Sequence, residues 1–200
     1  MHLVCLDLEG VLVPEIWIAV AEKTGRPELR RTTRDEPDYD KLMRYRLELL
    51  DKHGITLPLI QEIINTLRPL EGAAEFLGWL RERTQVIILS DTFEQFAAPL
   101  MRQLDWPTLL CHELLVEKTG RICGYKLRMP DQKRKAVESL RAMNYDVIAA
   151  GDSHNDLSML QAANHGVLFR PTDAFASANP QFPVTRDHAA LKKEIGKLLV

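Results

Sequence analysis

The chain has 200 residues, of which 46% are hydrophobic and 27% charged, and its formal net charge is −2. This length allows one buried core with a small accessory domain. The balanced charge provides no basic surface for nucleic acid or for an anionic membrane, and excludes those two classes of partner.

The three cysteines, Cys5, Cys111 and Cys123, are widely spaced among apolar residues, which is typical of a reducing compartment rather than of a disulfide framework. The apolar start of the chain is interrupted at Asp7 and has no basic leader. No stretch approaches the roughly 18 apolar residues that a membrane span needs. We therefore expect a cytoplasmic protein.

The first predicted element is a short apolar strand, HLVCLDL, at residues 2–8. Residues 14–70 then contain no convincing strand but three amphipathic helical stretches, PEIWIAVAEK, DYDKLMRYRLELLDKHG and LPLIQEIINTL. Pro14 suits a first helical turn and Gly54 a C-terminal cap. Because this insertion is too long for a plain crossover connection, we predict a small helical-bundle cap after the first strand.

Apolar runs of strand length continue at residues 85–91, 146–152 and 165–169. Segments whose apolar residues have helical spacing lie between these runs and after the last one. The predicted helices span 73–83, 94–104, 133–143, 157–163 and 188–199. A β-hairpin is predicted in LLVEKTGRICGYKL, turning at 118–121. This alternation predicts an α/β fold with a Rossmann-like parallel sheet and helices on both faces. We expect a core domain of residues 1–13 and 71–200 and a cap domain of residues 14–70.

Three of the apolar runs end in polar residues. Asp7 ends the first, Ser90 with Asp91 the second, and Gly151 with Asp152 the third. Because the carboxyl ends of parallel strands form the ligand crevice of such sheets, these side chains should converge. The crevice would also receive Glu9, Asn155 and Asp156 from the turns that follow.

So many acids at one edge would repel one another unless a cation lies among them. Mg²⁺ is the expected ion, because it binds carboxylates, water and a substrate phosphate together. Lys133, at the start of a predicted helix, can supply a further positive charge. Taken singly, each acid is more often a turn or helix cap; their conjunction favours a site.

These residues carry a resemblance that covers essentially the whole chain. DLEGVLV, ILSDTF, the lysine in QKRKAV and AAGDSHND resemble, in order, the four motifs of the haloacid dehalogenase superfamily. The helical insertion resembles the cap of its phosphoserine phosphatase branch. The resemblance implies a Mg²⁺-dependent enzyme that hydrolyses L-phosphoserine to L-serine and phosphate through an aspartyl-phosphate intermediate. Glu9, where the family has Asp, favours the type that also transfers the phosphoryl group to homoserine.

The resemblance also implies roles for individual residues. Asp7 would be the nucleophile and Glu9 the general acid and base. The positive charge of Lys133 would offset the negative charges of Asp7 and of the phosphate. The metal ligands would be Asp7, the main-chain carbonyl of Glu9, Asp152 and Asp156. The phosphoryl group would be bound by Ser90, by the main chain of Asp91 that follows it and by Lys133, and Asn155 would either contact it or brace the loop. The substrate ammonium would be bound by Glu15 and the substrate carboxylate by Arg46.

Other interpretations stay open at this point. Glu15 could be an acid of a first helical turn, and Arg46 solvated helix surface. The substrate could be another small phosphorylated metabolite. A phospho-acceptor receiver domain, or a binding module without turnover, would combine similar acids with Mg²⁺, although a receiver domain has no helical insertion after its first strand. The sequence carries no signal for the oligomeric state.

Overall fold

A computed structural model of the chain describes residues 1–33, 35–36 and 38–199. Its centre is a seven-stranded sheet with the order β4-β3-β2-β1-β5-β6-β7. Every neighbouring pair is parallel except β3 and β4, which are antiparallel. The strands are β1 (His2–Leu6), β2 (Gln85–Phe93), β3 (Thr108–Val116), β4 (Ile122–Lys126), β5 (Asp146–Gly151), β6 (His165–Phe169) and β7 (Val184–Thr185). The predicted α/β fold class and the predicted hairpin are confirmed.

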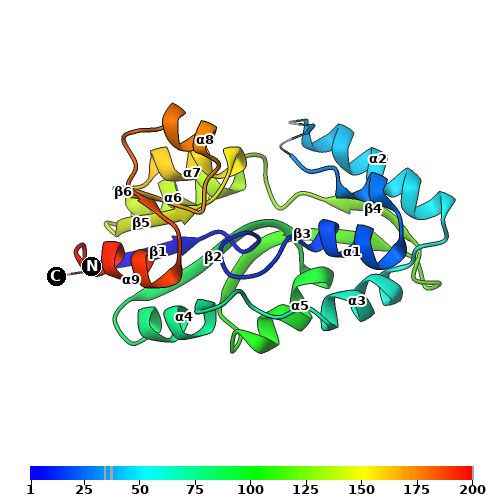
Figure 1. Ribbon diagram of the computed structural model, residues 1–200, viewed down its shortest axis with the longest axis horizontal. Coiled ribbons are helices and arrows are strands. Elements are labelled where there is room, and N and C mark those ends of the chain that lie inside the picture. The colour runs from blue at the N-terminus through cyan, green and yellow to red at the C-terminus, as the bar shows by residue number, and fades with distance from the viewer. Residues whose placement is uncertain (34, 37, 200) are drawn as a thin grey trace.

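Helices cover both faces of the sheet (Figure 1). In Figure 1, α4 and α5 lie below the strands, and α6, α7 and α8 lie above them. The helical segments are α1 (Ile16–Thr24), η1 (Pro27–Arg30), α2 (Tyr39–Lys52), α3 (Leu57–Asn65), α4 (Ala73–Arg81), α5 (Glu94–Gln103), α6 (Gln132–Ala142), η2 (His154–Asp156), α7 (Leu157–Ala162), α8 (Asp173–Ala178) and α9 (His188–Gly196).

The central strand β1 shows why the sequence reads as a continuous apolar run. Leu3 and Cys5 belong to the core on the side of α6 and α7, whereas Val4 and Leu6 belong to the core on the side of α4 and α5. Successive side chains of a strand point to opposite faces, and here both faces are covered. A strand buried in this way has no polar positions until it leaves the sheet.

Residues 14–70 carry α1, η1, α2 and α3, and the described part of this segment contains no strand. The insertion packs on two parts of the sheet domain. Helix α3 lies against α5, and α2 lies against β4. Helix α1 begins at Ile16, so the expectation that Pro14 forms its first turn is wrong; Pro14 lies in the connection before the helix. Gly54 follows α2 with a φ of +63°, a left-handed conformation that favours glycine, as predicted.

Besides the short helical turns η1 and η2, which were not predicted, three elements differ from the sequence-based expectation. Strand β3 begins at Thr108 and pairs with β2, although only its last three residues, 114–116, were predicted, as part of the hairpin. The six-residue helix α8 and the two-residue strand β7 were not predicted. The two residues of β7 cover a single period of a strand pattern, and Phe175 is the one large apolar residue of α8, so neither segment carries a repeating hydrophobic pattern.

Candidate active site

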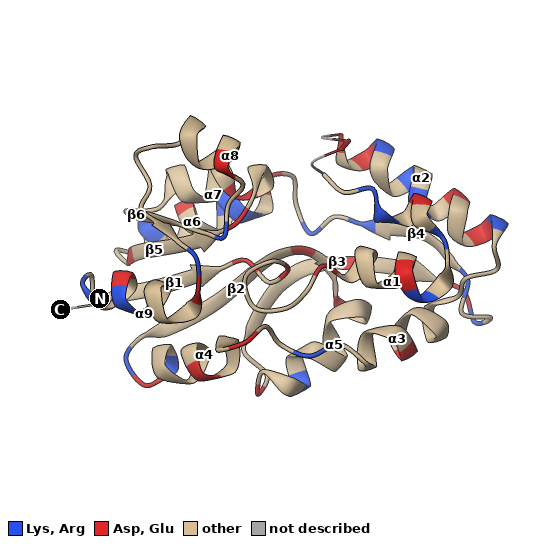
Figure 2. Ribbon diagram, in the orientation of Figure 1, with Lys and Arg blue, Asp and Glu red and all other residues tan. Residues whose placement is uncertain are grey.

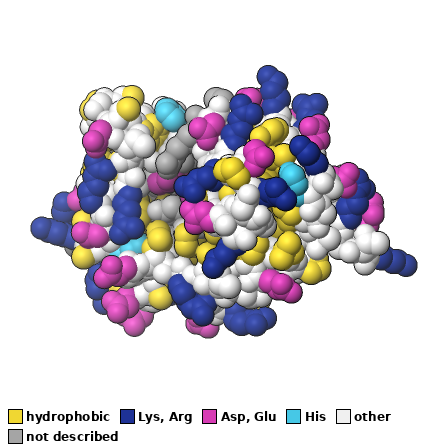
Figure 3. Space-filling model, turned by 45° about the vertical axis from the view of Figure 1, so that its right-hand side comes forward, with side chains coloured by type: hydrophobic (Ala, Val, Ile, Leu, Met, Phe, Trp, Pro, Cys, Tyr) yellow, Lys and Arg dark blue, Asp and Glu magenta, His cyan; other side chains and the backbone are white. Residues whose placement is uncertain are grey.

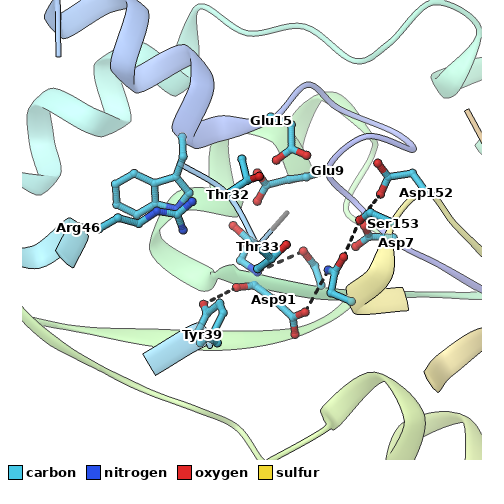
Figure 4. A pocket seen from close by; sticks show the side chains of 14 residues that line it. Asp7, Glu9, Glu15, Thr32, Thr33, Tyr39, Arg46, Asp91, Asp152 and Ser153 are labelled. Carbon is cyan, nitrogen blue, oxygen red and sulfur yellow. Dashed lines mark hydrogen bonds between the residues drawn. The ribbon is translucent and has the colours of Figure 1, made fainter. Parts of the chain in front are cut away.

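The carboxyl edge of the sheet forms a cavity beneath the inserted helices. Asp7 follows β1, Asp152 follows β5, and Ser90 and Asp91 lie within β2, which continues to Phe93 past a register irregularity. The cavity is lined from the sheet side by Asp7, Glu9, Ser90, Asp91, Thr92, Asp152, Ser153 and Asn155, and from the insertion side by Glu15, Trp17, Thr32, Thr33, Tyr39 and Arg46. Figure 4 shows these side chains directed toward one another. Figure 2 shows acidic residues in the loop after β1.

Lys133 is the buried cation at the base of this site. Its Nζ lies 2.8 Å from Asp7 Oδ1, 2.7 Å from Asp156 Oδ1 and 3.7 Å from Asp91 Oδ2. Although burial lowers it, the surrounding carboxylates hold the pKa of Lys133 well above its usual value. The first residues of helix α6 reach both strands: Gln132 donates to the carbonyl of Ser90 on β2, and Lys133 donates to Asp7 after β1.

The nucleophile candidate, Asp7, is buried among like charges. Burial is the main cause that raises the pKa of Asp7 well above its usual value, and Asp156 and Asp152 raise it further, while Lys133 opposes them. A positive ion beside Asp7 would reverse this shift, since it stabilises the carboxylate.

One carboxylate oxygen from each of Asp7, Asp152 and Asp156 lies within 4.8 Å of those from the other two. A donor set made only of carboxylate oxygen fits a hard divalent ion such as Mg²⁺. Asp156 is the deepest of the three: its Oδ2 accepts from the main-chain N–H groups of Asp152 and Ser153, at 2.9 and 3.3 Å. Asp7 and Asp152 line the cavity and Asp156 does not. Asp156 therefore orients the loop that carries Asp152.

Gly10 makes room for this acidic group. Its φ is +80°, and a Cβ atom at this position would lie 2.7 Å from Asp152 Oδ2. Both the left-handed backbone and the close approach require glycine. The turn out of β1 thus brings the main chain directly against the carboxylates.

Glu9 occupies a different part of the cavity from the three aspartates. Its Oε2 accepts a hydrogen bond of 2.8 Å from the N–H of Ile16, the first residue of α1. Burial raises the pKa of Glu9, while this hydrogen bond opposes the shift. Its side chain does not belong to the cluster formed by the carboxylates of Asp7, Asp152 and Asp156. That the main-chain carbonyl of Glu9 binds a metal ion stays a prediction.

The side chain of Asp91 is held by the protein itself. Its Oδ1 accepts from Gln132 Nε2 at 3.1 Å and lies 3.5 Å from His112 Nε2, and its Oδ2 accepts from Asn155 Nδ2 at 3.3 Å. Although burial raises it, the charge of Lys133 and these hydrogen bonds hold the pKa of Asp91 well below its usual range. The carboxylate therefore remains ionised, and positions Asn155 and Gln132.

Sequence reasoning missed three residues of this network: His112 on β3, Gln132 on α6 and Tyr39 on α2. Tyr39 donates from its hydroxyl to the main-chain carbonyl of Asp91 at 2.8 Å, and Gln132 donates to the carbonyl of Ser90 at 2.5 Å. Both contacts hold the end of β2. Nothing in the local sequence pattern indicated them, because each partner lies far away along the chain.

Ser90 and Asn155 frame the floor of the cavity. Ser90 is buried, and its Oγ accepts from the N–H of Thr92 at 3.2 Å. Asn155 Oδ1 accepts from the hydroxyl of Ser153 at 2.6 Å, while its amide nitrogen faces Asp91. The carboxamide is therefore oriented, and a hydroxyl and an amide remain close to Asp7 on the cavity wall.

Arg46 enters the cavity from α2 and is buried, with 5% of its surface exposed. Its guanidinium carbon lies 4.4 Å from the centre of the Trp17 ring, and its Nη2 donates to the carbonyl of Arg31 at 2.7 Å. Its Nε is buried without an acceptor among the described residues. Burial lowers the pKa of Arg46 to about 10, while Glu9 and Glu15 oppose the shift. Arg46 is therefore not solvated helix surface, and Glu15 lines the same cavity.

Comparison with known proteins places the geometry in context. Residues 1–164 match the family model of the haloacid dehalogenase-like hydrolases. The chain is 57% identical over 197 residues to "Phosphoserine phosphatase ThrH" of Pseudomonas aeruginosa, covering 98% of this chain and 96% of that protein. It is also 57% identical to a "Phosphoserine phosphatase" of Pseudomonas syringae pv. tomato, covering 83% of that protein.

Two solved structures share the fold at low sequence identity. One is described as a phospho-aspartyl intermediate analogue of phosphoserine phosphatase, with a TM-score of 0.81, 21% identity, and coverage of 96% of this chain and 98% of that one. The other is a substrate-bound phosphoserine phosphatase complex, with a TM-score of 0.80, 20% identity, and coverage of 96% and 97%. At these identities the likeness concerns the fold alone.

On the face shown in Figure 3, basic and acidic side chains are interspersed, and neither sign forms a continuous patch. Within the described residues, no helix combines the length and the apolar character needed to cross a bilayer.

Proposed function

The chain belongs to the haloacid dehalogenase-like hydrolases, and on that premise we propose that it is a Mg²⁺-dependent phosphatase of L-phosphoserine that works through a phosphorylated Asp7. The proposal is supported by the names of its 57% identical relatives and by the chemistry of the cavity. That cavity combines a buried carboxylate beside a buried ammonium with a second, separate acid at Glu9.

The observation that carries the substrate assignment is the buried Nε of Arg46, which has no acceptor among the described residues. A guanidinium donates to both oxygens of a carboxylate through its fork of N–H groups, and a buried donor without an acceptor costs about 1–3 kcal/mol. A substrate carboxylate would supply that acceptor. Glu15, on the same wall, would bind the substrate ammonium.

Chemistry begins with Asp7. A carboxylate oxygen of Asp7 attacks phosphorus in line, an O–P bond forms, and the bond between phosphorus and the serine oxygen breaks. Glu9, protonated at this stage, gives its proton to the departing serine oxygen. Lys133 and the polar groups of Ser90 and Asn155 balance the charge on the phosphoryl oxygens.

The second step returns the enzyme to its starting state. Glu9, now ionised, takes a proton from water as the water oxygen attacks phosphorus. The bond between phosphorus and Asp7 breaks, inorganic phosphate leaves, and Glu9 is protonated again. One acid thus serves both half-reactions, in opposite directions.

The residues present fit Mg²⁺, which Asp7, Asp152 and the main-chain carbonyl of Glu9 would hold, with Asp156 behind them. Bound there, the ion would neutralise charge on the phosphoryl oxygens. The hydroxyl oxygen of Ser153, whose proton is donated to Asn155 Oδ1 at 2.6 Å, lies 3.0 Å from Oδ1 of Asp152, one of the proposed ligands.

We also propose that residues 14–70 act as a cap domain over a core of residues 1–13 and 71–200. Arg46, Glu15 and Tyr39 all come from this segment, whereas the carboxylates and Lys133 come from the sheet domain. Substrate recognition would then reside in the insertion and phosphoryl chemistry in the core.

Transfer to an alcohol is a second fate of the same intermediate. We propose that the enzyme also passes the phosphoryl group from Asp7 to homoserine, with Glu9 taking the proton of the acceptor hydroxyl. Homoserine carries the same carboxylate and ammonium as serine, so Arg46 and Glu15 can hold it in the same way. The ThrH name of the relative supports this proposal.

The test is phosphate release from a panel comprising phosphoserine, phosphothreonine, phosphoethanolamine and 3-phosphoglycerate, with and without EDTA. Phosphoserine should be preferred, EDTA should abolish release, and Asp7→Asn should be inactive. Activity that survives Asp7→Asn would refute the mechanism. A preference for another ester would favour the alternative that the substrate is a different phosphorylated metabolite.

The transfer is tested by adding homoserine to a reaction with labelled phosphoserine. Labelled phosphohomoserine should form with wild type and not with Asp7→Asn. If only inorganic phosphate is labelled, the enzyme is a plain phosphatase.

A further inference from the structure

Glu9 and helix α1 are joined by a hydrogen bond of 2.8 Å from the N–H of Ile16 to Glu9 Oε2. Ile16 is the first residue of this nine-residue helix, so its N–H has no partner within the helix. The preceding residue, Glu15, makes no side-chain cap hydrogen bond to the helix. The acceptor for the first N–H is therefore the acid from the loop after β1.

The length of the Glu9 side chain makes this contact possible. Aspartate is shorter by one methylene, or about 1.5 Å along the chain. With the same backbone, the carboxylate of an aspartate at position 9 would fall short of Ile16 and leave a buried N–H without an acceptor. The side chain of Glu9 thus has the length needed to reach the start of α1.

The loop between Glu9 and α1 is itself tightly hydrogen-bonded. The N–H groups of Leu12 and Val13 donate to the carbonyl of Leu8 at 2.8 and 3.0 Å, and that of Gly10 donates to the carbonyl of Val13 at 2.8 Å. The main chain after Asp7 and the start of α1 therefore form one stiff unit, and the carboxylate of Glu9 closes it.

We propose that the main-chain N–H of Ile16 is a positioning group for the acid and base Glu9. The hydrogen bond fixes Oε2 against α1 and leaves Oε1 as the oxygen that exchanges a proton with the substrate. Because Glu15, on the substrate-binding wall, is the neighbour of Ile16 in the chain, the proton carrier and the substrate amino group are held by the same unit. This inference rests on the proposed function, in which Glu9 carries the proton.

The decisive pair of variants is Ile16→Pro and Ile16→Ala. Proline has no N–H and is favoured at the first position of a helix, and the backbone of Glu15, with φ −60° and ψ 114°, suits a residue before proline. Both variants lose packing of the fully buried Ile16 side chain, but only Ile16→Pro loses the hydrogen-bond donor. Their comparison therefore isolates the donor.

We expect kcat for phosphoserine to be at least tenfold lower in Ile16→Pro than in Ile16→Ala, with KM changed less than threefold. A positional error of about 1 Å in a proton-transfer group costs this much or more. Glu9→Asp should also lower kcat, and in its background the difference between the two Ile16 variants should vanish, since the contact is already lost. Equal kcat values for Ile16→Pro and Ile16→Ala would overturn the proposal.

Amide hydrogen exchange gives a second measurement that needs no turnover. The Ile16 N–H should exchange faster in Glu9→Asp than in wild type, while amides in α6 stay unchanged. Unchanged exchange at Ile16 would overturn the proposal even if Ile16→Pro does not fold. If wild type fails to hydrolyse phosphoserine, the proposed substrate is wrong, and the Ile16 pair is compared on the phosphomonoester that the enzyme does accept.

Discussion

Lys133 Nζ lies 2.8 Å from Asp7 Oδ1, although the two residues are 126 positions apart in the chain. The same nitrogen donates to Asp156 Oδ1 at 2.7 Å, and all three side chains are buried. This ion-pair cluster joins the end of β1 and the last residue of η2 to the start of α6. It is therefore a structural element as well as a group of candidate catalytic residues.

Replacing Lys133 by methionine should destabilise the protein by about 3–5 kcal/mol, because the buried carboxylates lose their cation. Equilibrium urea unfolding without metal measures the change. Lys135→Met, at an exposed position of the same helix, is the control and should cost less than about 0.5 kcal/mol. Equal effects of the two variants would contradict the view that the buried carboxylates depend on Lys133.

Mg²⁺ should raise the melting temperature more at about pH 7.5 than at about pH 5. Folding raises the pKa of Asp7, so the folded state binds the proton more tightly than the unfolded state. The stability of the metal-free protein should therefore fall as pH rises from the ordinary value of 3.8 toward the raised value. Mg²⁺ would bind in place of the proton that the folded protein holds at Asp7, so its stabilising effect should be larger where that proton is lost. Thermal scans with Mg²⁺ or EDTA at both pH values check this, and an effect independent of pH would contradict it.

Arg46→Ala should raise KM for phosphoserine at least tenfold, because the substrate carboxylate loses a charge-assisted pair of hydrogen bonds worth about 1.5–3 kcal/mol. The kinetics for phosphoethanolamine, which has no carboxylate, should change much less. Arg44→Ala, exposed on the same helix, should leave both substrates unaffected. Equal losses on both substrates would assign Arg46 a role in folding instead.

Asp91→Asn should lower the free energy of unfolding by about 1.5–3 kcal/mol at pH 7, since the hydrogen bonds to Asp91 are made to a charged acceptor. The folded-state pKa of Asp91 is depressed below 3.8, so this stabilisation is present above pH 3.8 and is lost as pH falls through the lowered value. Urea unfolding between about pH 3 and pH 7 should show a constant difference between the two proteins above pH 3.8, which begins to narrow below that value and is still largely present at about pH 3. Asp173→Asn, whose side chain is 96% exposed, is the control.

The fold was predictable because its information is local. The apolar runs around Val4, Ile88 and Ile148 are long enough to be recognised as buried strands, and each is followed by a segment with helical spacing. The carboxyl edge of a parallel sheet then follows from connectivity alone, so the convergence of Asp7, Ser90 and Asp152 could be expected without coordinates.

The network that orients the site could not be predicted in the same way. His112, Gln132 and Tyr39 reach Asp91 or its neighbour from three different elements, and no spacing along the chain encodes their meeting. The side chain of Asp91 illustrates the limit: the sequence suggested a phosphoryl contact only for the main chain that follows Ser90, and the hydrogen bonds that the Asp91 carboxylate accepts from Gln132 and Asn155 became visible only in the structure.

Sequence alone determined the α/β class, the helical insertion and the set of acids at the sheet edge, because strand burial, helix periodicity and strand direction are properties of consecutive residues. Only the tertiary structure decided which way each polar side chain points. Glu9 turns to the N–H of Ile16 and Lys133 to Asp7, because a buried polar group takes its hydrogen-bond partner from whatever packing brings within about 3 Å.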